Sequence, residues 1–223
     1  WLLCAAKLGL RGGAAGGGIV LCSAMQIVTL LFALLASTVG LTEPELAMAL
    51  RGDVPVRSEA MTTTAGKASG RGIGAIVVDR PLADVWAVVS HYEDKAEYQP
   101  RVEKVWVLEK QPDHLKVRMQ INASVTTARY TADFQLDHEA HTVRWRLDKN
   151  APDNTIKDCD GGYQLAEVEP GKTLVVYQGW VDSGRAVPRF IQEYMTRRSI
   201  PNLLRAVKKR VESGGTWKKG SRD

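Results

Sequence analysis

Side chains suited to acid–base or nucleophilic chemistry are sparse in this 223-residue sequence and poorly grouped. His138 and His141 are two of its four histidines, but their segment is typical of a turn, so we do not expect a helical metal-binding pair. Cys159 stands between Asp158 and Asp160, and two carboxylates raise the pKa of a thiol instead of activating it. We therefore expect no metal site, no catalytic residue and no cofactor.

Aromatic and long apolar side chains indicate more about fold and function, because they alternate with polar residues in several segments. Met119 and Ile121 follow this two-residue period, which is typical of a strand with one dry face. Tryptophan and tyrosine add a polar handle to a large apolar area, which suits a hydrophobic ligand. The candidate ligand-binding residues are Met119, Ile121, Phe134, Trp145, Trp180, Phe190, Tyr194 and Tyr98.

Two alternatives stay open for these candidates. A sheet packed on one helix needs large apolar residues in any case, so the set would also suit a solid core. Tyr98 lies in a short helix expected over His91–Gln99, where a cavity would open. It would gate that opening, although a surface position is the interpretation that we favour.

The elements that must position these residues extend from residue 72 to residue 213 and predict an α+β fold. Ile73–Val78 is a short apolar strand, and Pro81 then suits the first turn of a helix. Leu82, Val85, Trp86 and Val89 recur at helical spacing, so this helix buries one face. Antiparallel strands follow over Val102–Glu109, 115–121, 130–136 and 143–147, and then in a hairpin of Tyr163–Val168 and Thr173–Val181.

A long helix is expected from about Val187 to Ser213, with Pro201 as a kink or a break. Residues 185–223 contain eleven Lys or Arg and three Asp or Glu, whereas residues 1–184 carry a net charge of −3. Because the basicity is local, a general nucleic-acid role is not indicated, and an anionic membrane surface is the expected partner. A solvated face that contacts nothing is the alternative. The expected membrane-contact residues are Arg197, Arg198, Arg205, Lys208 and Lys209.

The flanking segments differ in composition from this domain. Ile19–Leu41 contains 23 residues without a charge, so residues 1–49 are expected to be a signal peptide or membrane anchor. The domain would then be exported, either periplasmic or extracellular, or anchored outside the cytoplasm. Small and Gly-rich residues predict a flexible linker over 50–71, and residues 214–223 are expected to form a frayed basic tail.

Several stretches resemble the START-like (SRPBCC) superfamily, closest to its polyketide cyclase/Coq10-like branch. They are Val78–Val89, Tyr98–Val102, Gly161–Leu165 and Arg198–Leu204. The resemblance implies a helix-grip fold, in which a curved antiparallel sheet wraps around a long C-terminal helix and encloses a hydrophobic cavity. It favours binding, or transport, of a hydrophobic small molecule or lipid without catalysis, and the alternative is a polyketide cyclase or aromatase. Fold alone does not decide between them, and the oligomeric state stays open.

Overall fold

The structure is a computed structural model that describes residues 30, 32–62, 68–122, 127–184 and 189–221, with residues 68–69 and 189–196 described for the backbone only. The chain divides into two compact units, residues 1–43 and 44–223. In the first unit, residues 32–38 are helical. No helix within the described ranges is long and apolar enough to cross a bilayer. Most of the expected signal peptide or anchor, residues 1–49, lies outside the described residues.

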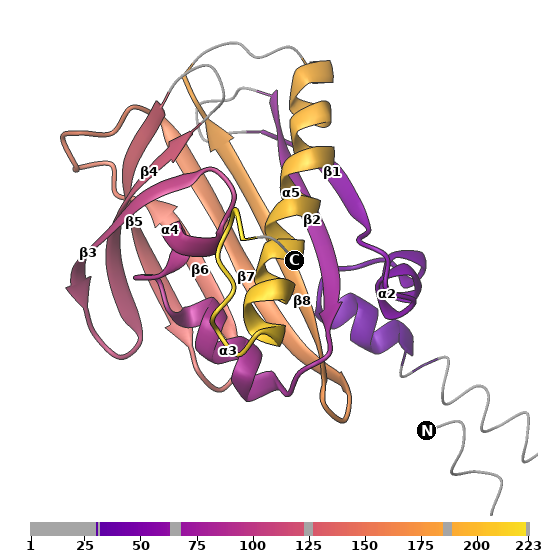
Figure 1. Ribbon diagram of the computed structural model, residues 1–223. Coiled ribbons are helices and arrows are strands. Elements are labelled where there is room, and N and C mark those ends of the chain that lie inside the picture. Colours follow the sequence, from indigo (N-terminus) through magenta and orange to yellow (C-terminus); the bar gives the residue numbers. More distant parts are fainter. Residues whose placement is uncertain (1–29, 31, 63–67, 123–126, 185–188, 222–223) are drawn as a thin grey trace, which may run out of the picture. The chain divides into compact units, whose positions relative to one another are not determined.

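The second unit is built on one antiparallel sheet, in the order β1-β2-β8-β7-β6-β5-β4-β3. The sheet curves around the long helix α5, with the short helices α3 and α4 nearby (Figure 1). This arrangement confirms the predicted α+β helix-grip fold. The strands are β1 (Val56–Thr62), β2 (Ala68–Val78), β3 (Val102–Lys110), β4 (His114–Asn122), β5 (Thr127–Asp137), β6 (Thr142–Leu147), β7 (Asp158–Glu169) and β8 (Lys172–Asp182). The helices are α2 (Glu43–Leu50), α3 (Leu82–Ser90), α4 (Lys95–Tyr98) and α5 (Arg189–Glu212).

The flexible linker predicted over 50–71 is corrected by the structure, because β1 and the start of β2 occupy half of it. β1 pairs antiparallel with β2 from Val56 opposite Gly74 to Thr62 opposite Ala68. Arg57 of β1 is also ion-paired with Glu45 of α2. Backbone pairing at a sheet edge needs no apolar side chains, so a polar composition did not reveal the strand.

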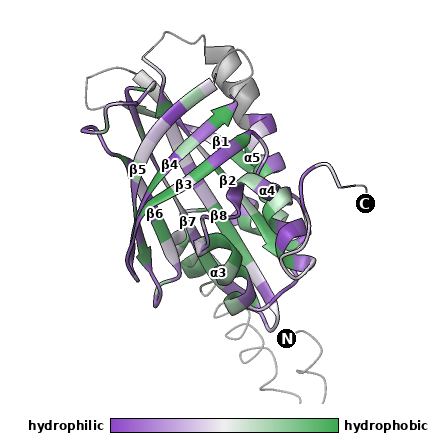
Figure 2. Ribbon diagram, turned by 60° about the vertical axis from the view of Figure 1, so that its left-hand side comes forward, coloured by the Kyte–Doolittle hydropathy of each residue, from purple (hydrophilic) through white to green (hydrophobic). Residues whose placement is uncertain are grey.

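The helix α5 packs against β1 and β2 and against α3. Its approach to β2 is close at Gly74, where an added Cβ would lie 2.4 Å from Cγ2 of Ile200 and 3.2 Å from Cδ1 of Leu204. Pro201 does not split α5, which is one helix from Arg189 to Glu212. Figure 2 shows hydrophobic and hydrophilic residues alternating along several strands, as expected for a sheet with one face on the core.

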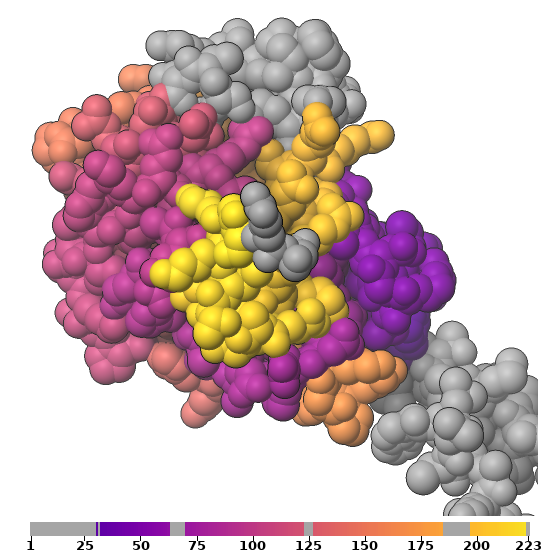
Figure 3. Space-filling model, in the orientation of Figure 1, coloured from indigo at the N-terminus to yellow at the C-terminus, as the bar shows by residue number. Residues whose placement is uncertain are grey.

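The tail predicted as frayed is packed over the part that the structure describes, residues 214–221. Trp217 packs against the hydrophobic core, and its carbonyl accepts a hydrogen bond of 2.9 Å from the buried Arg210. The backbone N–H of Lys219 donates to the carbonyl of Glu97 over 2.9 Å. In the space-filling view, these yellow residues lie directly on the magenta surface of the domain (Figure 3). Long-range contacts with α4 therefore order a segment whose composition is typical of a loop.

Candidate functional site

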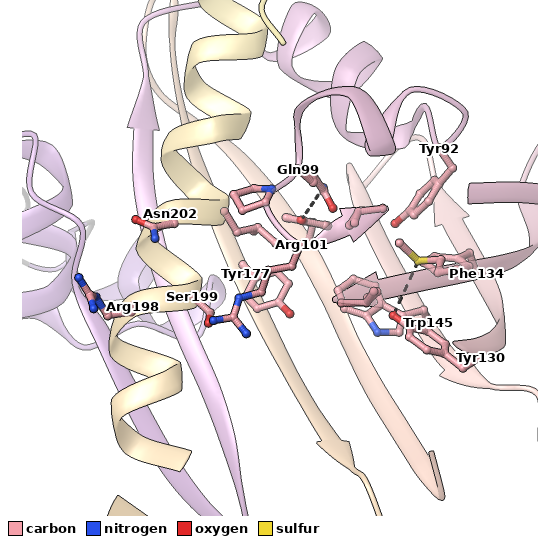
Figure 4. Close-up of a pocket in the computed structure, with 16 residues that line it drawn as sticks. Tyr92, Gln99, Arg101, Tyr130, Phe134, Trp145, Tyr177, Arg198, Ser199 and Asn202 are labelled. Atoms are coloured by element: carbon pink, nitrogen blue, oxygen red, sulfur yellow. Dashed lines mark hydrogen bonds between the residues drawn. The ribbon is translucent and has the colours of Figure 1, made fainter. Parts of the chain in front are cut away.

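A cavity of about 550 Å³ lies between the sheet and α5. Its walls come from β4, β5, β6, β7 and β8, from the loops on either side of α4, from the first residue of β3, and from α5. The interior is mainly aromatic, and the side next to α5 is more polar (Figure 4). The interior side chains are Tyr92, Met119, Tyr130, Phe134, Trp145, Tyr163 and Tyr177.

Four of the candidate ligand-binding residues line this cavity: Met119, Ile121, Phe134 and Trp145. Their strands are neighbours in the sheet, and the register places Phe134 directly opposite Trp145. The two rings lie 5.8 Å apart between centroids. The two-residue period thus gave the correct face for β4, β5 and β6.

The other candidates have different positions. Trp180 is buried but does not line the cavity. Tyr177 does line it, and successive residues of a strand point to opposite faces, so Trp180 belongs to the other face of β8. Tyr98 is 1% exposed and lines no part of the cavity, so the surface position favoured for it is wrong. Phe190 and Tyr194 lie in α5, but their side chains are outside the described residues.

Trp145 is the centre of the aromatic interior. Its ring lies 5.7 Å from that of Tyr163 and 5.9 Å from that of Tyr177, between centroids. The indole lies over Gly161, its cross-strand neighbour, where an added Cβ would be 2.2 Å from Cζ2 of Trp145. A glycine at this position therefore makes room for the indole against the sheet.

Among the interior side chains, those that sequence reasoning missed are tyrosines. Tyr130 shares its phase with Phe134 in β5, so the alternation already noted would have found it. Tyr163 and Tyr177 face each other across β7 and β8, with ring centroids 5.3 Å apart. Tyr92 precedes α4, and no local pattern indicated that its buried hydroxyl, which has no hydrogen-bond partner, would lie beside the cavity.

Lys95 is a buried cation that the sequence did not reveal. Its side chain is fully enclosed, and Nζ donates hydrogen bonds to the carbonyls of Val88 and Val89 over 3.2 and 2.8 Å. A third bond, of 2.9 Å, joins it to the hydroxyl of Tyr98. The two carbonyls belong to the last turn of α3, where a cation is favoured by the helix dipole. Lys95 therefore caps α3 and fixes the loop that carries Tyr92.

We expect Lys95 to make stability depend on pH. Burial lowers the pKa of Lys95 to about 7, so between pH 7 and its ordinary pKa the unfolded chain binds more protons at this site than the folded protein. The free energy of unfolding should therefore rise with pH from 7 to 8.5, by about 1–2 kcal/mol. Urea unfolding at both pH values measures this rise, which the variant Lys95→Met should lack.

The same comparison separates Lys95 from other groups that titrate near this range. Burial raises the pKa of the Cys159 thiol to about 12. As pH rises, the unfolded chain therefore loses this proton at a lower pH than the folded protein, and the free energy of unfolding falls above about pH 8.5. Both proteins contain Cys159, so only their difference reports on Lys95. An equal pH dependence in the two proteins would contradict the prediction.

Arg101 lines the cavity from the loop between α4 and β3. Its backbone is left-handed, with a φ of 68°, which is uncommon for a residue other than glycine. In Figure 4 its side chain extends from the loop toward α5, whereas the side chain of Arg198 extends from α5 away from Arg101. Arg101 thus brings a positive charge to the α5 side of the cavity.

The expected membrane-contact residues all lie on α5, but they differ in their contacts. Arg197, Arg198, Arg205 and Lys209 are exposed. The Lys209 ammonium also lies 5.5 Å from the ring centroid of Trp217. Lys208 points to β2 and its neighbours, where it forms ion pairs of 2.8 Å with Asp79 and Glu212. Lys208 therefore contributes to the fold, and the other four remain a basic surface.

Comparison with known proteins gives the same fold and a broad class. Residues 73–212 match the model of a family described as polyketide cyclase / dehydrase and lipid transport. The chain therefore belongs to this family, which confirms the START-like resemblance and its polyketide-cyclase branch. No curated protein matches the sequence.

Solved structures with this fold include proteins of both kinds. The STAR-related lipid transfer protein of Xanthomonas axonopodis has a TM-score of 0.59 and 13% identity, over 71% of this chain and 93% of that one. The Zhui aromatase/cyclase of Streptomyces sp. R1128 has a TM-score of 0.55 and 19% identity, over 71% and 94%. Human StAR-related lipid transfer protein 5 has a TM-score of 0.55 and 13% identity, over 82% and 98%. At these identities the likeness defines the fold alone.

Proposed function

We propose that this protein binds a hydrophobic small molecule or lipid in the cavity and carries it without transforming it. The observation that supports this most directly is the aromatic interior, which offers large apolar surfaces to a ligand. A volume of about 550 Å³ lies within the usual range of small-molecule sites. Each 100 Å² of apolar ligand surface removed from water would contribute about 2.5 kcal/mol to binding. The loop from α4 to β3 and the helix α5 form the lid.

Native mass spectrometry and lipid extraction test this proposal. The full chain, purified from a bacterial host, is expected to retain an apolar molecule of defined mass, or to take up apolar fluorophores once emptied. A protein that arrives empty and then binds none of a panel of such fluorophores would contradict carriage.

A polyketide cyclase or aromatase is the second candidate, and Arg101 is the observation that favours it. A cyclase needs polar groups that orient a chain of carbonyls, and Arg101 and Ser199 both line the cavity. Incubation with a synthetic poly-β-ketone, followed by chromatography and mass analysis, separates the two functions. A carrier returns the compound unchanged, whereas a cyclase releases a product that has lost water.

We also propose that the basic residues of α5 dock the protein on an anionic membrane. Arg198 lines the cavity, so Arg197, Arg198 and Arg205 lie on the helix that borders its opening. A basic residue near an anionic bilayer contributes about 1 kcal/mol. Docking through this surface would bring the opening close to the lipid from which a ligand is taken.

Reversing two of these charges should weaken docking. We expect Arg197→Glu/Arg205→Glu to bind vesicles containing phosphatidylglycerol at least about 30-fold more weakly than the unmodified protein, as measured by co-sedimentation. The matched control, Lys104→Glu/Arg144→Glu, makes the same charge change on exposed residues of β3 and β6. An equal loss in both variants would mean that net charge, and not the α5 surface, causes the binding.

Export of the domain is a further proposal, which rests on the uncharged run Ile19–Leu41 and the acidic residues Glu43 and Glu45 after it. Fusion of the complete chain to alkaline phosphatase, an enzyme active only outside the bacterial cytoplasm, tests it. Phosphatase activity is expected. An inactive fusion that is present at full length would contradict export.

A further inference from the structure

Arg101 stands out among the charged residues near the cavity because the backbone holds it in an unfavourable conformation. A left-handed residue with a side chain costs about 1 kcal/mol or more, so such a conformation persists only where the surroundings enforce it. Here the carbonyl of Arg101 accepts a hydrogen bond of 2.8 Å from the N–H of Asn122. Lys219 of the packed tail donates to the carbonyls of Gln99 and Val102 on either side.

These contacts hold the loop from two directions, β4 on one side and the tail on the other. As a result, Pro100, Arg101 and Val102 all contribute to the cavity wall. The side chain of Arg101 extends from this loop toward α5 (Figure 4). The backbone strain thus accompanies the placement of a guanidinium at the cavity.

The charge of Arg101 is not balanced within the cavity wall. Arg101 and Arg198 are the charged members of the described lining, which contains no Asp or Glu. In Figure 4 the side chain of Arg198 extends from α5 away from Arg101. Ser199 and Gln99 also line the cavity and add a hydroxyl and an amide, and the amide donates a hydrogen bond of 3.4 Å to the hydroxyl of Tyr163. A guanidinium with such neighbours suits an oxyanion, to which it can donate two parallel hydrogen bonds.

We propose that the ligand is an anionic amphiphile, whose carboxylate or phosphate group pairs with Arg101 while its apolar part lies in the aromatic interior. This inference rests on the proposed carrier function and specifies the ligand class and its orientation. The anionic group lies toward α5, and the apolar end points toward Phe134 and Trp145. Arg101 is then the residue that distinguishes an acid from an alcohol of the same length.

Dodecanoate and dodecanol test this proposal, since they share a chain and differ in charge. We expect the full-length protein to bind dodecanoate at least about tenfold more tightly than dodecanol, by competition with an apolar fluorophore. The variant Arg101→Gln should lose about tenfold or more in affinity for dodecanoate and less than twofold for dodecanol. Dodecyl phosphate, measured in parallel, shows which of the two anionic groups is preferred.

Two further variants make the result specific. Arg198→Gln removes the other lining arginine and should leave the preference for dodecanoate unchanged. Arg101→Gly relieves the left-handed backbone, so it should fold at least as well and still lose the preference. Equal losses for dodecanoate and dodecanol in Arg101→Gln, or an equal effect of Arg198→Gln, would overturn the proposal while leaving carriage intact. If neither compound nor the fluorophore binds, the carrier function itself fails.

Discussion

Gly161→Ala is expected to lower the free energy of unfolding by about 3 kcal/mol, at the upper end of the range for overpacking in a core. The added methyl group would lie 2.2 Å from Cζ2 of Trp145 and 2.6 Å from the carbonyl oxygen of Gln178. The first contact displaces a large ring that has other rings around it, and the second is with backbone that the sheet holds in place. Urea unfolding followed by circular dichroism measures the change.

Gly179→Ala is the matched control for this variant. Gly179 pairs with Gly161 across β7 and β8, but its added methyl group would meet the hydroxyl end of the Tyr177 side chain at 2.7 Å. A side chain can move aside more cheaply than a backbone carbonyl, so the control should cost less than half as much. Equal stability of Gly161→Ala and the unmodified protein would show that Trp145 does not depend on the glycine beneath it.

Ile121→Trp is expected to reduce the binding of apolar probes by about 100-fold or more. Ile121 lines the cavity and pairs with Val102 at the start of β3, so a larger side chain would fill space beside the Arg101 loop. A loss of this size corresponds to about 3 kcal/mol of apolar contact between ligand and wall. Fluorophore titration measures the affinity, and retained lipid is measured by native mass spectrometry.

Gln120→Trp shows whether this effect comes from the cavity. Gln120 is the neighbour of Ile121 in β4, points to the other face of the sheet and donates a hydrogen bond of 2.8 Å to Glu103. The control should bind the probes within about twofold of the unmodified protein, and both variants should unfold within about 1 kcal/mol of it. Unchanged binding in Ile121→Trp would mean that the ligand occupies some other site.

The cavity wall was predictable where a strand has a clear alternation and was missed elsewhere. Met119, Phe134 and Trp145 were found because every second residue of a strand shares a face. Trp180 was chosen for its type, and β8 in fact presents Tyr177 to the cavity. Composition also misled at the edges of the domain, since β1 and the tail are ordered by hydrogen bonds and contacts with distant residues.

The sequence by itself determined the order of the elements from β2 to α5 and the wet and dry faces of β4, β5 and β6, and four of its stretches resembled the START-like class. The order and the faces depend on residues close together in the chain, whose periodicity can be read directly, whereas the class came from the resemblance to a known family. Only the tertiary structure decided that Lys95 is buried, that Gly161 lies under Trp145, and that Arg101 reaches the cavity. Each of these depends on segments far apart in sequence that the sheet and α5 bring together, and no local pattern indicates that these segments meet.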